Sequence, residues 1–215
     1  MGIRAGTIVF DFDGVIVDSG ADIANAVAYT LKAFGRPVLS REEITGYVGG
    51  GAEQLIRKSF KDCGEDIIKE ALPFYKKYYL DNCVVETRLY DNVRETLSFF
   101  SGKNLAILTN KPEDLTYRIL ERLEVMKFFK LVIGPESVQR LKPDPEGLVK
   151  VLQSLGESPQ NALMVGDTYT DIEVGKRAGA RTCGVTYGLG DTGALAAAGP
   201  DIIIDDMGEL MLHVK

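Results

Sequence analysis

Runs of consecutive apolar residues recur along the chain and predict strands that are buried on both faces. The first run is Thr7-Ile8-Val9-Phe10, in which apolar side chains follow one another without polar alternation. Continuous runs of this kind are typical of parallel sheets, which helices cover on both sides. Comparable runs lie at 105–108, 131–133, 162–165, 183–186 and 202–204.

Helix signals separate the later runs. Pro112 suits the first position of a helix, and Glu113 and Asp114 follow it, where the helix dipole favours acidic side chains. Residues 171–178 predict another helix, with Gly179 as its end. Because strands and helices alternate, we expect an α/β fold with a Rossmann-like parallel sheet and helices on both of its faces.

One long interval interrupts this alternation. Residues 11–104 hold no comparable strand run, and a connection of that length is far beyond an ordinary loop. Helix signals occur there instead, at 21–34, at the capping box Ser40-Arg41-Glu42-Glu43, and at 52–62, 65–80 and 91–100. We therefore expect a small all-helical cap domain at 18–90, inserted after the first strand of a core domain made of 1–17 and 91–215. The helically spaced Tyr75, Tyr78 and Tyr79 are expected in the cap's own core.

Composition narrows the possible functions. Apolar residues make up 45% of the chain and charged residues 26%, as in ordinary globular proteins. The net charge of −6 argues against a nucleic-acid partner, which favours a basic surface. No apolar run reaches the roughly 18 residues that span a membrane, and Asp11 and Asp13 interrupt any signal-peptide core. We expect a cytoplasmic protein, with no membrane partner and with reduced thiols at Cys63, Cys83 and Cys183.

Residues that could carry chemistry follow the predicted strands. Asp11 and Asp13 stand two apart after the first run and would share one face of an extended strand. Asp167 and Asp171 lie four apart at the start of a helix, and Lys142 could add a positive charge. In open parallel sheets, ligands bind at the carboxyl ends of the strands. A carboxylate there could attack a phosphate dianion if a hard cation such as Mg²⁺ offset the repulsion.

Four short segments stand in order along the chain: DFDGV at 11–15, LTNK at 108–111, KPDPE at 142–146 and GDTYTD at 166–171. Each is weakly specific alone. In this order, each beside a predicted strand or helix start, they resemble the motifs of the haloacid dehalogenase superfamily, and of its phosphatase branch with a helical cap in particular. The resemblance extends from Thr7 to about Met211.

The resemblance implies a role for each motif residue. Asp11 would attack phosphorus and become an aspartyl phosphate. Asp13 would protonate the leaving alcohol and then take a proton from the attacking water. Thr109 and the backbone near Asn110 would hold the phosphoryl oxygens, and Lys142 would screen the negative charges.

A Mg²⁺ cofactor is also implied by the resemblance. Its ligands would be the Asp11 carboxylate, the carbonyl oxygen of Asp13 and Asp167, with Asp171 close by or acting through water. Asp13 further indicates the branch, because members that cleave carbon–halogen bonds lack a carboxylate at this position. The acid is present here, which favours phosphoester hydrolysis.

The stretch 47–56 looks like the cap loop of phosphoglycolate phosphatases. Gly49 and Gly50 would offer bare backbone N–H groups to a substrate anion, as a helix start does. A plain turn between two helices explains the same residues equally well. Asp91-Asn92 departs from the Pro-Gly that is common where such caps end. The resemblance makes a small phosphorylated metabolite the expected partner, 2-phosphoglycolate the first guess, and a monomer or homodimer the expected state.

Several other functions stay open. A pyrophosphatase, a nucleotide phosphatase or a sugar phosphomutase would use the same core, although phosphomutases tend to show Ser-Ala where this chain has Thr109-Asn110. A phosphate-binding sensor without turnover is the alternative outside the enzymes. Residues 188–193 also match the GxGxxG nucleotide pattern, but the helix predicted at 194–198 is too short for a dinucleotide-binding unit.

Overall fold

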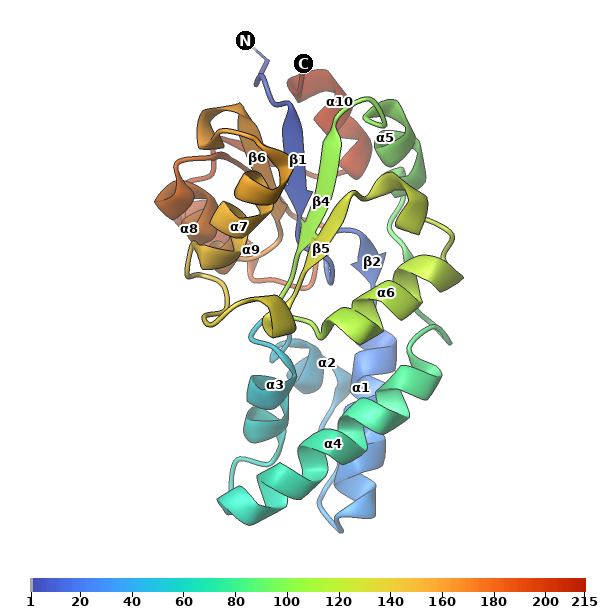
Figure 1. The fold of residues 1–215 in the computed structure, drawn as a ribbon. Helices are drawn as coiled ribbons and strands as arrows, with labels where there is room; N and C mark the ends of the chain where they lie inside the picture. Colours follow the sequence, from blue (N-terminus) through green and yellow to red (C-terminus); the bar gives the residue numbers. More distant parts are fainter. Residues whose placement is uncertain (1) are drawn as a thin grey trace.

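A six-stranded sheet forms the centre of the larger part of the molecule (Figure 1). The computed structural model describes residues 2–215. All paired strands of this sheet are parallel, in the order β5-β4-β1-β6-β7-β8. The strands are β1 (Thr7–Phe10), β4 (Asn104–Leu108), β5 (Leu131–Ile133), β6 (Ala162–Gly166), β7 (Arg181–Val185) and β8 (Ile202–Ile204). Every predicted run forms a strand, and the α/β fold is confirmed.

Helices cover both faces of this sheet. Successive residues of β1 point to opposite sides, so Ile8 and Phe10 pack into one apolar cluster while Val9 packs into another. Leu97 and Ile119 belong to the first cluster and come from α5 and α6. The second cluster takes residues from α7 and α8. The helices of this part are α5 (Val93–Phe99), α6 (Glu113–Arg122), α7 (Glu146–Leu155), α8 (Tyr169–Ala178), α9 (Thr192–Ala197) and α10 (Leu210–His213).

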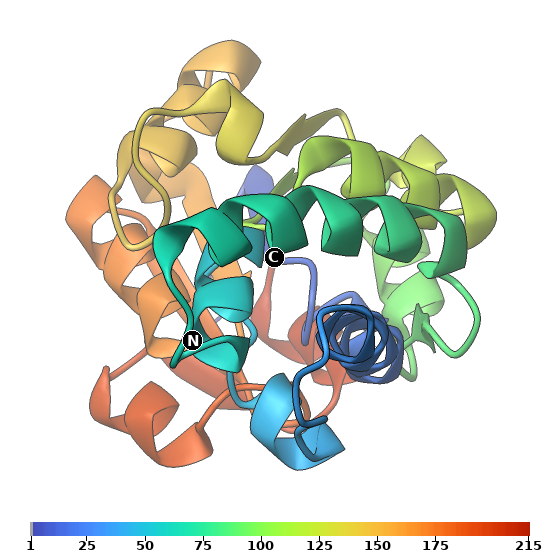
Figure 2. The same cartoon turned by 90° about the horizontal axis from the view of Figure 1, so that it is seen from below.

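Four further helices lie beyond the carboxyl ends of the strands (Figure 1). They are α1 (Gly20–Ala33), α2 (Arg41–Thr45), α3 (Ala52–Ser59) and α4 (Glu65–Asn82). α1 and α4 pack against each other, and α3 contacts both. In the view from below, α4 runs across the middle of the molecule (Figure 2). Tyr75 and Tyr79 of this helix are buried, as expected.

Two very short strands, which the sequence pattern did not predict, join the helical part to the sheet. β2 (Val17–Asp18) pairs antiparallel with β3 (Arg88–Leu89). Two-residue strands are too short to leave a periodic apolar signal. This pairing places side by side the two segments in which the chain passes between the sheet and the helical part. We propose 18–90 as the cap domain and 1–17 with 91–215 as the core domain, divided at this ribbon.

Helix ends differ from the predicted ends by a few residues. The helix predicted at 171–178 begins at Tyr169, because Thr168 caps it. Pro112 precedes α6 instead of opening it. α5 begins only at Val93, because Asn92 takes the left-handed conformation, with φ at 59°.

Two expectations from composition can be compared with the structure. All three cysteines are free thiols, of which Cys83 and Cys183 are buried and Cys63 is half-buried. This agrees with the reduced thiols that the sequence predicts. Across residues 2–215, no helix combines the length and the apolar character that a membrane crossing needs.

Candidate active site

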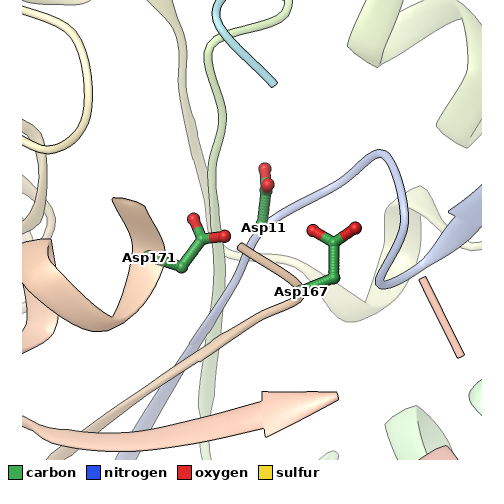
Figure 3. A group of neighbouring side chains, drawn as sticks. All are labelled: Asp11, Asp167 and Asp171. Carbon is green, nitrogen blue, oxygen red and sulfur yellow. The ribbon is translucent and has the colours of Figure 1, made fainter. Parts of the chain in front are cut away.

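Three carboxylates meet at the carboxyl ends of the central strands. Asp11 follows β1, Asp167 follows β6, and Asp171 lies in the first turn of α8. Phe10 and Val165 are partners across the parallel β1–β6 pair, so Asp11 and Asp167 leave neighbouring strands at nearly the same level. One oxygen of each carboxylate lies within 4.8 Å of the others, and all three residues are buried (Figure 3). The fold thus brings together acids from two separate motifs.

Lys142 lies between two of these carboxylates. Its Nζ is 2.8 Å from Asp11 Oδ1 and 2.7 Å from Asp171 Oδ1, and its side chain is 2% exposed. Burial by itself lowers the pKa of Lys142, but the two carboxylates hold this pKa above its ordinary value. Burial also raises the pKa of Asp11 to about 7, against the opposing charge of Lys142. The lysine therefore offsets only part of what burial costs the charged form of Asp11.

A glycine loop holds Asp167 in place. Asp167 Oδ2 accepts hydrogen bonds from the backbone N–H groups of Leu189 and Gly190, at 2.8 and 2.9 Å. A Cβ atom on Gly188 would lie 2.5 Å from this oxygen, and one on Gly190 would lie 2.2 Å from the Asp167 carbonyl oxygen. Both positions therefore need glycine. The GxGxxG match at 188–193 is explained by its packing against a carboxylate.

The other oxygen of Asp167 is free to bind a cation. Asp167 Oδ1 is buried and has no hydrogen-bond partner among the described residues, which is unusual for a buried polar atom. Burial, and then the charges of Asp11 and Asp171, raise the pKa of Asp167 well above its usual value. A cation among the three carboxylates would complete the bonding of Oδ1 and offset the repulsion. Carboxylate oxygens are hard ligands, and Mg²⁺ prefers such ligands. The residues present fit that ion.

Asp171 has both of its oxygens engaged. Oδ1 accepts a hydrogen bond from Lys142, and Oδ2 accepts from the backbone N–H and the hydroxyl of Thr168, at 3.1 and 2.6 Å. The contacts with Thr168 also form the capping box that starts α8. Asp171 thus holds Lys142 in position.

Thr109 and Asn110 lie on another flank of the site, and both are buried. Thr109 Oγ1 accepts a hydrogen bond from the backbone N–H of Lys111, at 3.1 Å. Asn110 Nδ2 donates to the carbonyl oxygen of Gly49, at 2.8 Å, and Asn110 Oδ1 accepts from the backbone N–H of Lys142, at 3.0 Å. The Asn110 side chain therefore links the cap loop to Lys142. Both the nitrogen and the oxygen of its amide are engaged within the protein.

The cap loop encloses a small cavity over these groups. Gly49 lines this cavity together with Asp11, Asp13 and Thr109, and its volume is about 40 Å³. One water molecule needs about 10–15 Å³, so only a few atoms fit while the cap is in this position. Gly49 and Gly50 both line an adjoining and wider cleft. Gly49 therefore borders both spaces, whereas Gly50 borders only the wider one.

Three residues that were not among the predicted site residues contact Asp13, either directly or through Lys111. Ser19 Oγ donates to Asp13 Oδ1 at 2.5 Å. Lys111 Nζ donates to both carboxylate oxygens, at 3.0 and 3.2 Å, and to the Tyr79 hydroxyl oxygen, at 2.8 Å. Lys111 is the last residue of the LTNK motif, and this position was the sign in the sequence that it could belong to the site. Helical spacing showed only that Tyr79 is buried, because it reveals nothing about the far end of the side chain.

This arrangement agrees with comparisons to known proteins. The model of the haloacid dehalogenase-like hydrolase family matches residues 8–185. The chain belongs to this family. Among curated relatives, a phosphoglycolate phosphatase of Aquifex aeolicus is 40% identical over 183 residues, which is 84% of each chain. A phosphoglycolate phosphatase of Pseudomonas putida is 34% identical over 212 residues, which is 95% of this chain and 78% of the relative.

Solved structures of the family share the fold over nearly the whole chain. The crystal structure of a predicted phosphoglycolate phosphatase from Haemophilus somnus superposes with a TM-score of 0.93 at 30% identity and covers 97% of both chains. A haloacid dehalogenase-like family hydrolase from Streptococcus pneumoniae gives a TM-score of 0.86 at 29% identity, over 98% of this chain and 97% of that one.

Proposed function

We propose that this family member is a Mg²⁺-dependent phosphatase that hydrolyses a small phosphomonoester through an aspartyl phosphate on Asp11. One observation carries the proposal: the buried Asp11 carboxylate is paired with the Lys142 ammonium and lies close to the carboxylate of Asp167, whose Oδ1 has no partner among the described residues. Phosphate repels a carboxylate unless positive charge stands on both sides of the attack. Lys142 supplies that charge on one side, and a cation held by Asp167 would supply it on the other.

In the first half-reaction, the Asp11 carboxylate forms a bond to phosphorus, and the bond from phosphorus to the alcohol oxygen breaks. Asp11 Oδ1 already forms an ion pair with Lys142 and accepts a hydrogen bond from the backbone N–H of Phe12, so we assign the attack to Oδ2. Asp13, which follows on the same loop, gives its proton to the leaving alcohol. Thr109 and the backbone N–H of Asn110 hold the phosphoryl oxygens.

In the second half-reaction, water replaces the alcohol. Asp13 takes a proton from the water, whose oxygen bonds to phosphorus, and the bond from phosphorus to Asp11 breaks. Inorganic phosphate leaves and both carboxylates return to their first state. Mg²⁺, when bound by Asp11, Asp167 and the carbonyl oxygen of Asp13, with Asp171 nearby, would neutralise charge on the phosphoryl oxygens.

The substrate we propose is a small phosphomonoester that carries a second anionic group beside its phosphate. The cavity of about 40 Å³ beside Asp11 and Asp13 has room for only a few substrate atoms while the cap is in this position. Curated relatives at 40% and 34% identity carry the name phosphoglycolate phosphatase. Both observations support 2-phosphoglycolate as the first substrate.

The rate of phosphate release, measured in the presence of Mg²⁺, tests this function. We expect kcat/KM for 2-phosphoglycolate to exceed that for sugar phosphates, nucleoside monophosphates and pyrophosphate at least tenfold. A higher value on another ester would keep the phosphatase and replace the substrate. Binding of phosphate without turnover of any ester would instead favour the sensor.

A further inference from the structure

A buried lysine connects the cap to the proposed general acid. Lys111 Nζ reaches both oxygens of the Asp13 carboxylate and the hydroxyl oxygen of Tyr79. Lys111 follows β4 in the core, whereas Tyr79 belongs to α4 of the cap. The Lys111 side chain is 4% exposed and that of Asp13 is 12% exposed. Nothing in the reaction proposed above uses this lysine.

The position of the Lys111 ammonium is determined from both sides. An ammonium group has three N–H donors, and here Nζ lies within hydrogen-bond distance of three acceptors: the two neighbouring oxygens of Asp13 and the hydroxyl oxygen of Tyr79. Its nitrogen also lies 4.5 Å from the centre of the Tyr79 ring, within the range of a cation–π contact. Removing the Tyr79 hydroxyl would leave one donor of a buried cation unpaired, and a buried cation then reorients to find another partner.

Both oxygens of Asp13 depend on this contact. Ser19 holds only Oδ1, while Lys111 spans Oδ1 and Oδ2 and so fixes the rotation of the carboxyl group. A general acid acts well only when its proton points at the leaving oxygen. We propose that Lys111 and Tyr79 are positioning residues for Asp13, and that the packing of α4 against the core through Tyr79 sets the orientation of this acid. This inference rests on the proposed function.

The proposal makes proton delivery depend on the cap. When α4 lies over the site, Tyr79 holds Lys111 and Lys111 holds Asp13. A site without its cap would contain the same Asp11 and Lys142 but a less well oriented acid. Esters whose leaving group needs a proton should therefore respond to Tyr79, whereas phosphates whose leaving group departs as a stable anion should not.

Three phosphorylated compounds of similar size distinguish leaving groups that need a proton from those that do not. 2-Phosphoglycolate and ethyl phosphate lose an alkoxide, which needs a proton, while acetyl phosphate loses acetate, which does not. The measured quantity is kcat/KM, because it covers only the steps through transfer to Asp11 and excludes the later attack of water. The variants are Tyr79→Phe and Lys111→Met. Tyr78→Phe is the matched control, since Tyr78 neighbours Tyr79 on α4 but stacks on Tyr29 of α1.

We expect Tyr79→Phe to lower kcat/KM about tenfold on both alkyl phosphates, and Lys111→Met about 100-fold, within the contribution of a general acid. On acetyl phosphate both variants should stay within about twofold of the wild type, and Tyr78→Phe should stay there on all three substrates. Retained turnover of acetyl phosphate also shows that a variant has folded.

Other results would overturn the inference. An equal loss on all three phosphates would mean that the variants damage the site generally. A loss on 2-phosphoglycolate alone would mean that Lys111 binds the substrate carboxylate instead of orienting Asp13. A wild-type protein that turns over none of the three would reject the proposed function, and the inference with it.

Discussion

The core side and the cap side of the site are built in different ways. On the core side, each charged group has several fixed partners: Lys142 bridges two carboxylates, and one oxygen of Asp167 rests on two backbone N–H groups. The cap side consists mostly of loop backbone at Gly49 and of apolar side chains such as Leu55, with the Tyr79 hydroxyl as a polar exception. Buried charge networks tolerate little change, whereas loops and apolar surfaces tolerate substitution.

This difference separates chemistry from substrate choice. A change at Asp11, Lys142 or Asp167 on the core side should reduce turnover of every substrate, because all substrates present the same phosphoryl group. A change on the cap side should alter the relative rates of substrates, because the cap faces the part of the molecule that differs between them.

The largest effect is expected from Asp11→Asn, which removes the nucleophile on the core side. Turnover should fall below about 1% of the wild type on every substrate, because an amide does not replace a covalent catalyst. Phosphate release with Mg²⁺ measures this. Asp62→Asn, at an exposed acid of the cap, is the control and should keep full activity. Residual turnover above about 1% would reject Asp11 as the nucleophile.

Gly188→Ala should weaken metal binding about 10- to 100-fold, the usual cost of disturbing a group that orients a metal ligand. Its Cβ would lie 2.4 Å from the Cβ of Asp167 and would displace this carboxylate. Titration of activity with Mg²⁺, together with calorimetry, measures the affinity. Gly193→Ala is the control, since its Cβ would meet only Asp191 Oδ1, at 3.2 Å. Unchanged affinity in Gly188→Ala would place the metal away from Asp167.

A smaller effect is expected in the pH dependence of stabilisation by Mg²⁺. The pKa of Asp11 in the folded, metal-free protein is about 7, above its ordinary value of 3.8. The folded protein therefore holds this proton more tightly than the unfolded chain, and the resulting stability is lost as pH rises from about 4 to 7. Mg²⁺ needs the ionised carboxylate, so it competes with the proton below pH 7.

We therefore expect Mg²⁺ to raise the thermal midpoint by about 3 °C more at pH 8 than at pH 5.5, or about 1 kcal/mol for a chain of this size. Calorimetric scans with and without the ion measure this. The difference between the two pH values should shrink in Asp11→Asn. An Mg²⁺ effect that is equal at both pH values would mean that the ion does not bind at Asp11.

The smallest effect is expected from the cap variant Gly50→Ala. Its Cβ would overlap the Gln54 side chain, at 1.4 Å from Oε1, and this flexible side chain can move aside. KM should change about threefold, by different factors for different substrates, while kcat stays the same. Gly64→Ala in the same domain is the control, because its Cβ would meet nothing within 4 Å. A tenfold fall in kcat would show that the cap loop takes part in the chemistry.

Local signals explain why the strands could be predicted. Each core strand is a short apolar run next to a helix signal, and such patterns depend only on neighbours in the sequence. The ribbon of β2 and β3 was missed because these strands have two residues each. The predicted start of α8 was too late, because Thr168 caps the helix and Asp171 already lies in its first turn.

The sequence by itself determined the α/β class and the inserted helical segment, which follow from periodicity and turn residues, both of them local. It also proposed Asp11, Asp13, Lys142 and Asp167 as site residues, through the motifs that contain them. The motifs also carried the resemblance that the family match confirms.

Only the tertiary structure decided which of these groups touch. Strand order places β6 beside β1 and thereby joins Asp167 to Asp11 across more than a hundred residues of sequence. Cap packing brings Tyr79 to Lys111, and loop packing brings the glycines at 188 and 190 against Asp167. Such contacts depend on how separate elements meet, and the periodicity of one element contains no information about the side chains of another.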